Sequence, residues 1–102
     1  MADESDIQRR LRELQRQMGR LQESQQELER SLEEIDHRAR HVSDRLERAG
    51  GTDRAAEGER SQLRANRTRN QAEWDSNEQR LQRLREETGE LEQQIRRLRG
   101  GS

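Results

Sequence analysis

Two histidines, His37 and His41, stand at a spacing that could hold a metal ion. Residues four apart share one face of a helix, so both imidazoles could reach one ion, and Glu33, Glu34 or Asp44 could add an oxygen ligand. The spacing enforces no third ligand, and both histidines fall on the outer face of the helix that the apolar pattern predicts. We therefore expect solvated surface histidines, with no metal and no other cofactor.

An arginine-rich segment, Arg60–Gln71, contains no acidic residue and is the best candidate for a nucleic-acid contact. Phosphates are bound by arginines that lie on an exposed face. Arg67 falls on the apolar stripe described below and must extend outward to reach solvent, whereas Arg64 is expected to face Asp36 and Arg69 has no predicted partner. Arg64, Arg67 and Arg69 are thus the possible nucleic-acid contacts.

Three amides, Gln25, Asn70 and Asn77, interrupt the apolar pattern. If Gln25 faces Asn77 between two helices, their side chains can hydrogen-bond and fix the register at some cost in stability. We interpret the amides as register determinants; the alternative is a binding notch beside Trp74. Trp74 is the only aromatic residue. We interpret it as filling a gap between smaller neighbours, although an exposed Trp would be a contact for a protein partner.

The elements that must position these residues follow from one repeat. Apolar side chains recur from Ile7 to Leu98 at alternating steps of four and three, and every Leu, Ile, Val and Trp lies on this stripe, which we call the seam. This is the heptad pattern of a coiled coil. With 25% hydrophobic and 42% charged residues, the 102-residue chain cannot fill a core of several layers. Composition alone leaves disorder or paired helices, and the periodicity favours paired helices.

The middle of the chain predicts a turn. Gly50 and Gly51 together cost a helix about 2 kcal/mol relative to alanine, and Gly can adopt the left-handed cap that ends a helix, while Thr52 or Asp53 can cap the next one. We predict an all-α, antiparallel two-helix coiled-coil hairpin with helices over about residues 4–49 and 53–99. It forms a single domain, residues 1–102, with disorder at 1–3 and 100–102. The heptad phase continues across the glycines, so an unbroken helix that dimerises is an alternative.

Charges beside the seam favour antiparallel helices. Folding about residue 51 brings Asp36 to Arg64 and Arg45 to Glu59, and no like-charged pair arises. A parallel dimer would oppose like charges, and each exposed pair matters by about 0.2–1 kcal/mol. The like-charged pairs of the parallel dimer are Glu73–Glu78, Arg80–Arg85 and Glu87–Glu92.

A swapped antiparallel dimer of straight helices would make the same contacts as the hairpin. We favour the monomeric hairpin because the glycine pair marks a turn and because closure within one chain benefits from a high effective concentration. A four-helix bundle of two hairpins is less favoured, since the positions beside the seam are polar. The apolar layers are more regular toward the termini, so we expect the terminal half to be the more stable and the half near the turn to fray first.

Net charge is −1, from 21 basic residues, all of them Arg, and 22 acidic ones, so no strong attraction to nucleic acid or to a membrane is predicted. The absence of Cys excludes disulfides and thiolate metal sites. No apolar run suits a signal peptide or a membrane span, so we expect a cytoplasmic location. No set of residues suggests catalysis, because a two-helix coiled coil offers no concave site that excludes water.

Two stretches resemble the helical Rab-binding domains of MICAL-type proteins. They are the start Ile7–Leu14 and the Glu73-Trp74 pair followed by Leu84. That family has apolar residues after the Trp, where this chain has Asp75-Ser76, so no site residue is carried over. The tRNA-binding arm of seryl-tRNA synthetases is similar in shape alone.

We therefore expect a non-enzymatic coiled-coil module that acts as a structural spacer, scaffold or adaptor, through a protein partner or self-association. The alternative, from a different class of function, is a helical arm that binds nucleic acid through arginines. The regular seam, the absence of Lys and the glycine-rich end fit a natural or a designed origin alike.

Overall fold

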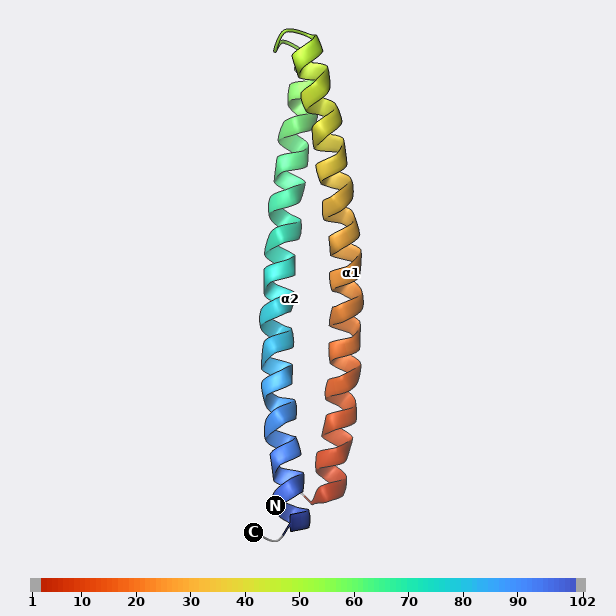
Figure 1. The fold of residues 1–102 in the computed structure, drawn as a ribbon, viewed down its shortest axis with the longest axis vertical. Helices are drawn as coiled ribbons and strands as arrows, with labels where there is room; N and C mark the ends of the chain where they lie inside the picture. The colour runs from red at the N-terminus through yellow and green to blue at the C-terminus, as the bar shows by residue number, and fades with distance from the viewer. Residues whose placement is uncertain (1–2, 101–102) are drawn as a thin grey trace. The chain divides into compact units, whose positions relative to one another are not determined.

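The computed structural model describes residues 3–100. It contains helix α1, Glu4–Arg48, and helix α2, Arg54–Gly100, joined by a short turn. The two helices account for 94% of the described chain, which leaves no strand among these residues. The helices run antiparallel (Figure 1), so the predicted all-α helical hairpin is confirmed.

Both helices begin at an aspartate cap. The backbone N–H of Asp6 donates to Asp3 Oδ1 at 2.9 Å, and the backbone N–H of Ala56 donates to Asp53 Oδ1 at 3.0 Å. Of the two predicted caps for the second helix, Asp53 is therefore the one in use, while the Thr52 hydroxyl donates to the carbonyl of Ala49, the residue that follows α1. Because a cap residue is itself not helical, α2 begins one residue later than the prediction placed it.

The ends of the predicted domain extend past the described residues. The disorder expected at residues 1–3 and 100–102 falls mostly outside residues 3–100. Within that range, Asp3 caps α1 and Gly100 is the last residue of α2, and the expected disorder stays a prediction.

The turn depends on the glycine pair. Gly50 and Gly51 have φ values of 69° and 86°, in the left-handed region that side chains disfavour. The N–H of Gly51 donates to the Leu46 carbonyl at 2.7 Å, and the N–H of Gly50 donates to the Glu47 carbonyl at 3.1 Å. This bonding pattern is a Schellman motif, which satisfies carbonyls left open at the end of α1. The predicted left-handed glycine cap is thus confirmed.

The hairpin divides into two compact units, each built from a part of both helices. The first, which we call the terminal unit, comprises Met1–Ser24 and Ser76–Ser102, and the second, the turn unit, comprises Gln25–Asp75. Each unit is described by itself below.

In the terminal unit, α1 is more completely buried than α2. Its seam residues Ile7, Leu14 and Leu21 are buried, and Leu81 is their buried counterpart on α2. Toward its end α2 is less covered, since Leu98 is 56% exposed. The seam of α2 therefore weakens toward the end of the helix, although its residues remain apolar.

The turn unit contains a continuous apolar cluster. Ile35, Val42 and Leu46 of α1 pack with Ala56 and Leu63 of α2. Small Ala56 is fully buried, which lets the two helices approach closely next to the turn. This cluster lies in the half that the sequence predicts to fray first. The order in which the two halves open stays a prediction. The burial of this cluster, however, leads us to expect that the half near the turn opens last.

Every buried residue of the described chain lies on the predicted seam, and the residues beside the seam are half-buried or exposed. The hydrophobic area is therefore used to hold α1 against α2, as a strict heptad requires.

Candidate functional site

Each of the two buried amides of the seam donates a hydrogen bond within its own unit. Gln25 and Asn77 are each 6% exposed. In the turn unit, Gln25 Nε2 donates to the Trp74 carbonyl at 3.2 Å, and in the terminal unit, Asn77 Nδ2 donates to Ser24 Oγ at 3.2 Å. No buried side-chain nitrogen or oxygen of residues 3–100 lacks a hydrogen-bond partner. The direct bond between the two amides stays a prediction, and so does their role in fixing the register.

Asn70 and Trp74 occupy the seam of α2 within the turn unit. Asn70 is half-buried and its Nδ2 donates to Ser31 Oγ at 2.7 Å, so a serine beside the seam of α1 satisfies it. Trp74 is half-buried and does not belong to the exposed large apolar residues of the described chain. Its role, as a gap-filling residue or as a contact for a protein partner, stays a prediction. The sequence did not single out the serine partners; a signal would have been the small hydroxyl residues next to seam positions that face Asn.

The candidate nucleic-acid arginines are arranged differently from the prediction. Asp36 was predicted to meet Arg64 but pairs with Arg67, whose Nε lies 3.3 Å from Asp36 Oδ1. Arg67 occupies a seam position where a guanidinium cannot be buried, so its long side chain leaves the seam sideways and reaches the carboxylate on α1. Arg64 is exposed, and among residues 3–100 no carboxylate lies within ion-pair distance of it. Arg69 Nη2 hydrogen-bonds Asn66 Oδ1 at 2.6 Å.

Arg45 connects the two helices near the turn. Its guanidinium lies 3.5 Å from Glu59, which confirms the predicted pair, and 3.3 Å from Asp53, which the sequence did not single out as its partner. The pKa of Asp53 is lowered from its ordinary value of 3.8, first by the hydrogen bond from the Ala56 N–H and then by the charge of Arg45. Both effects favour the ionised carboxylate that caps α2.

A second cross-helix ion pair, in the terminal unit, was not anticipated. Arg10 donates from Nε and Nη2 to the two carboxylate oxygens of Glu87 at 3.0 and 3.1 Å, in a bidentate arrangement. Hydrogen bonding to Glu87 raises the pKa of the Arg10 guanidinium above its ordinary value. Glu13, one turn further along α1, adds a second negative charge at 3.3 Å. The Arg10–Glu87 pair therefore links α1 to α2 within the terminal unit.

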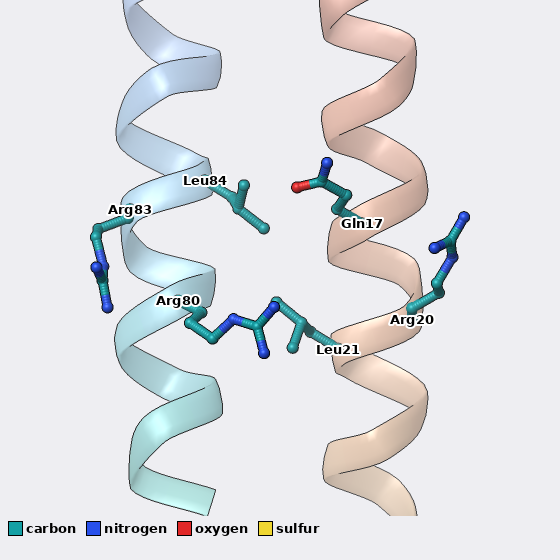
Figure 2. Close-up of a pocket in the computed structure, with 6 residues that line it drawn as sticks. All are labelled: Gln17, Arg20, Leu21, Arg80, Arg83 and Leu84. Carbon is teal, nitrogen blue, oxygen red and sulfur yellow. The ribbon is translucent and has the colours of Figure 1, made fainter.

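An open groove of about 510 Å³ lies between the helices of the terminal unit (Figure 2). Leu21 and Leu84 both point into the space between the helices, and the Arg80 side chain reaches across toward Leu21, while Arg20 and Arg83 point away. The groove offers a small apolar contact beside positive charge. Its lining residues are Gln17, Arg20, Leu21, Arg80, Arg83 and Leu84.

The histidine pair lies on the exposed surface of α1, as predicted. The two rings contact each other, with His37 Nε2 and His41 Nε2 3.1 Å apart. No group of three or more His, Cys, Asp or Glu side chains that could hold a metal ion occurs within residues 3–100. Any ion bound here would therefore have two protein ligands.

These observations define the class of the protein as a two-helix antiparallel coiled coil with polar outer faces. No protein-family model matches the chain, and neither the curated proteins nor the solved structures contain a significant match. Within residues 3–100, neither helix has an apolar stretch long enough to cross a membrane.

Proposed function

We propose that this chain is a non-enzymatic coiled-coil module that serves as a structural spacer, scaffold or adaptor. The observation that carries the proposal is that every buried residue of the described chain lies on the seam. The buried apolar surface therefore serves to pair the two helices. Polar and charged outer faces then remain for contact with a protein partner. We further propose that the module acts as a monomeric hairpin.

The ionisable groups support a structural role over a catalytic one. Active sites typically combine a concave pocket with a strongly perturbed pKa. Within residues 3–100, resolved pKa shifts occur at Arg10 and Asp53, and a cross-helix ion pair and a helix cap account for them. Neither group lines the groove at Leu21 and Leu84.

A spacer or scaffold must keep a fixed separation between its parts, which a distance distribution between spin labels can test. One label pair, Ser5→Cys with Ser61→Cys, joins the terminal unit to the turn unit at exposed positions. The matched control, Ser5→Cys with Gln22→Cys, lies on α1 within the terminal unit and reports the width caused by the labels alone, over about 25 Å of helix. We expect both distributions to be equally narrow. A broad or divided distribution for the joining pair would reject the spacer role.

The monomeric state is tested by mass. Sedimentation equilibrium at tens of micromolar is expected to return the single-chain mass of 12.2 kDa. Twice that mass would instead favour the swapped antiparallel dimer or a four-helix bundle, in which two chains share the seam.

An arginine-dependent nucleic-acid-binding arm is the second candidate function. What favours it is Arg64, which is exposed and lacks the neutralising contact with Asp36 that the sequence predicts. Binding through phosphates must weaken steeply as salt rises from about 50 to 200 mM. The double variant Arg64→Gln/Arg69→Gln should then lose affinity for duplex or single-stranded nucleic acid.

The matched control for the nucleic-acid test removes the same charge elsewhere. Arg12→Gln/Arg16→Gln alters two exposed arginines of α1 outside the arginine-rich segment. If binding depends on the segment, this control keeps the affinity of the unaltered chain. Absence of salt-sensitive binding by the unaltered chain rejects the second candidate.

A further inference from the structure

The two exposed histidines of the turn unit are in contact through their rings. His37 Nε2 and His41 Nε2 are 3.1 Å apart, and the ring centroids are separated by 4.6 Å with the ring planes at 87°. At this distance a proton on one Nε2 can be donated in a hydrogen bond to the other Nε2, and the tautomers decide which ring is the donor. Both nitrogens thus occupy neighbouring points outside the helix, accessible from solvent.

We propose that His37 and His41 form a chelating site for a divalent transition-metal ion, with Nε2 of both imidazoles as protein ligands and water in the remaining positions. The distance between the nitrogens carries the proposal. Two imidazole nitrogens at about 2.1 Å from one ion are about 3.0 Å apart at a right angle and about 3.4 Å apart at a tetrahedral angle. The observed 3.1 Å falls between these values. Chelation requires the rings to rotate until both lone pairs aim at one ion instead of lying along the line between the two nitrogens.

The proton balance of binding is simple. In the neutral pair each ring holds one proton, and one of the two lies on the Nε2 that donates to the other ring. The metal ion takes the place of this shared proton, and both rings then hold their proton on Nδ1. Binding to the neutral pair therefore releases no proton.

The backbone beneath the pair is well supported. Ile35 and Val42 of α1, which flank the histidines in sequence, are 8% and 2% exposed and belong to the apolar cluster of the turn unit. This packing holds the two histidine Cα atoms one helical turn apart before any ion binds, so little conformational entropy is lost on chelation. The carboxylate of Glu34, three residues before His37, is paired with Arg38 at 2.8 Å. Carboxylate competition with the two nitrogens for the ion is thereby reduced.

The donor set determines which ion the site selects. Imidazole nitrogens suit copper, nickel and zinc, and affinity for such a site follows the order in which Cu²⁺ exceeds both Ni²⁺ and Zn²⁺. Mg²⁺ and Ca²⁺ prefer oxygen ligands and are not expected to bind here. With two protein ligands the ion remains exchangeable and open to further ligands from a partner.

The test is isothermal titration calorimetry of the full chain with copper, nickel or zinc chloride. We expect one ion per chain, with Cu²⁺ bound most tightly. His41→Gln leaves one imidazole and should weaken binding by about tenfold or more, because the second ligand no longer acts within the same molecule. His41 is exposed, so the helical circular dichroism signal of His41→Gln should be unchanged.

A matched control keeps two histidines but separates them. His41→Gln/Asp44→His places the imidazoles seven positions apart, about 10.5 Å along the helix, which one ion cannot span. This control should bind metal as weakly as His41→Gln alone. The proposal is overturned if the unaltered chain binds nickel no more tightly than His41→Gln, or if the separated pair binds as tightly as the original one.

Discussion

Replacing Gly50 and Gly51 by alanine is expected to convert the hairpin into a swapped antiparallel dimer. The heptad phase is continuous across the two glycines, so the same seam can close between two chains once each chain forms one straight helix. The glycines favour the hairpin because both adopt positive φ values of 69° and 86°. No atom lies within 4 Å of a Cβ added at either position, so the effect arises from backbone conformation alone.

The magnitude follows from two backbone effects. A left-handed conformation costs an L-residue about 1–2 kcal/mol, so the two alanines destabilise the turn by about 2–4 kcal/mol. Within a straight helix, alanine is favoured over glycine by about 1 kcal/mol per residue, or about 2 kcal/mol for the pair. The balance shifts by about 4–6 kcal/mol per chain and by about twice that per dimer. A millimolar effective concentration favours the hairpin over the dimer at tens of micromolar chain by about 2 kcal/mol, which is smaller than this shift.

Sedimentation equilibrium of Gly50→Ala/Gly51→Ala at tens of micromolar should return twice the mass of the single chain. The matched control is Gly58→Ala/Gly89→Ala, which makes the same two replacements within α2, where an added Cβ also meets no atom within 4 Å. The control should stay monomeric. A monomeric Gly50→Ala/Gly51→Ala variant, or dimerisation of the control, would refute the reasoning that the turn is maintained by left-handed glycine.

Four further measurements test the packing and the caps. Leu14→Ala should lower the free energy of unfolding in urea by about 2–5 kcal/mol because Leu14 is 0% exposed, whereas Leu98→Ala, at a side chain that is 56% exposed, should change it by less than about 0.5 kcal/mol; equal losses would contradict the burial pattern. Replacing Gln25 and Asn77 together by Leu should raise the urea midpoint while permitting other registers, and a lower midpoint would count against a register role. The N–H that Asp53 caps lowers the pKa of its carboxyl from 3.8, so the stability this group contributes is present above that value and lost as pH falls through the lower folded-state pKa. The melting temperature of the unaltered chain should therefore fall more steeply below about pH 4 than that of Asp53→Asn. Identical pH profiles of the two melting temperatures would show that the cap charge has no effect. Hydrogen exchange should be slower around the apolar cluster of the turn unit than near the end of α2. The reverse order would support the expectation from the sequence that the terminal half is the more stable one.

The seam was predictable because heptad periodicity is a local property of the chain. Side chains at steps of four and three fall on one side of a helix whatever that helix packs against, so the positions of Leu14 and Val42 in the interface follow from spacing alone. The turn was predictable for a similar reason, since adjacent glycines both disfavour helix and permit positive φ. The charges beside the seam predicted the antiparallel orientation, because only that orientation brings opposite charges together. The ion pair between Arg45 and Glu59 confirms one of these predicted contacts.

The partners of long charged side chains were not predictable at the level of single residues. Asp36 was expected to meet Arg64 by register arithmetic, but Arg67 has several rotatable bonds and reaches the carboxylate from a seam position. The bidentate contact of Arg10 with Glu87 was missed because register arithmetic assumes straight, short side chains. The candidate sites were the least predictable features for this reason. The nucleic-acid candidate depends on which guanidinium is neutralised, and the histidine pair depends on how two imidazoles rotate.

The sequence by itself therefore determined the helices, the seam, the turn and the antiparallel direction, because each depends on backbone preference or on spacing that repeats along the chain. Only the tertiary structure decided how completely each seam layer is buried, which arginine neutralises Asp36, and that His37 and His41 meet at their Nε2 atoms. The physical reason is that these properties depend on rotamers and on the approach of side chains in space, and a heptad pattern specifies neither.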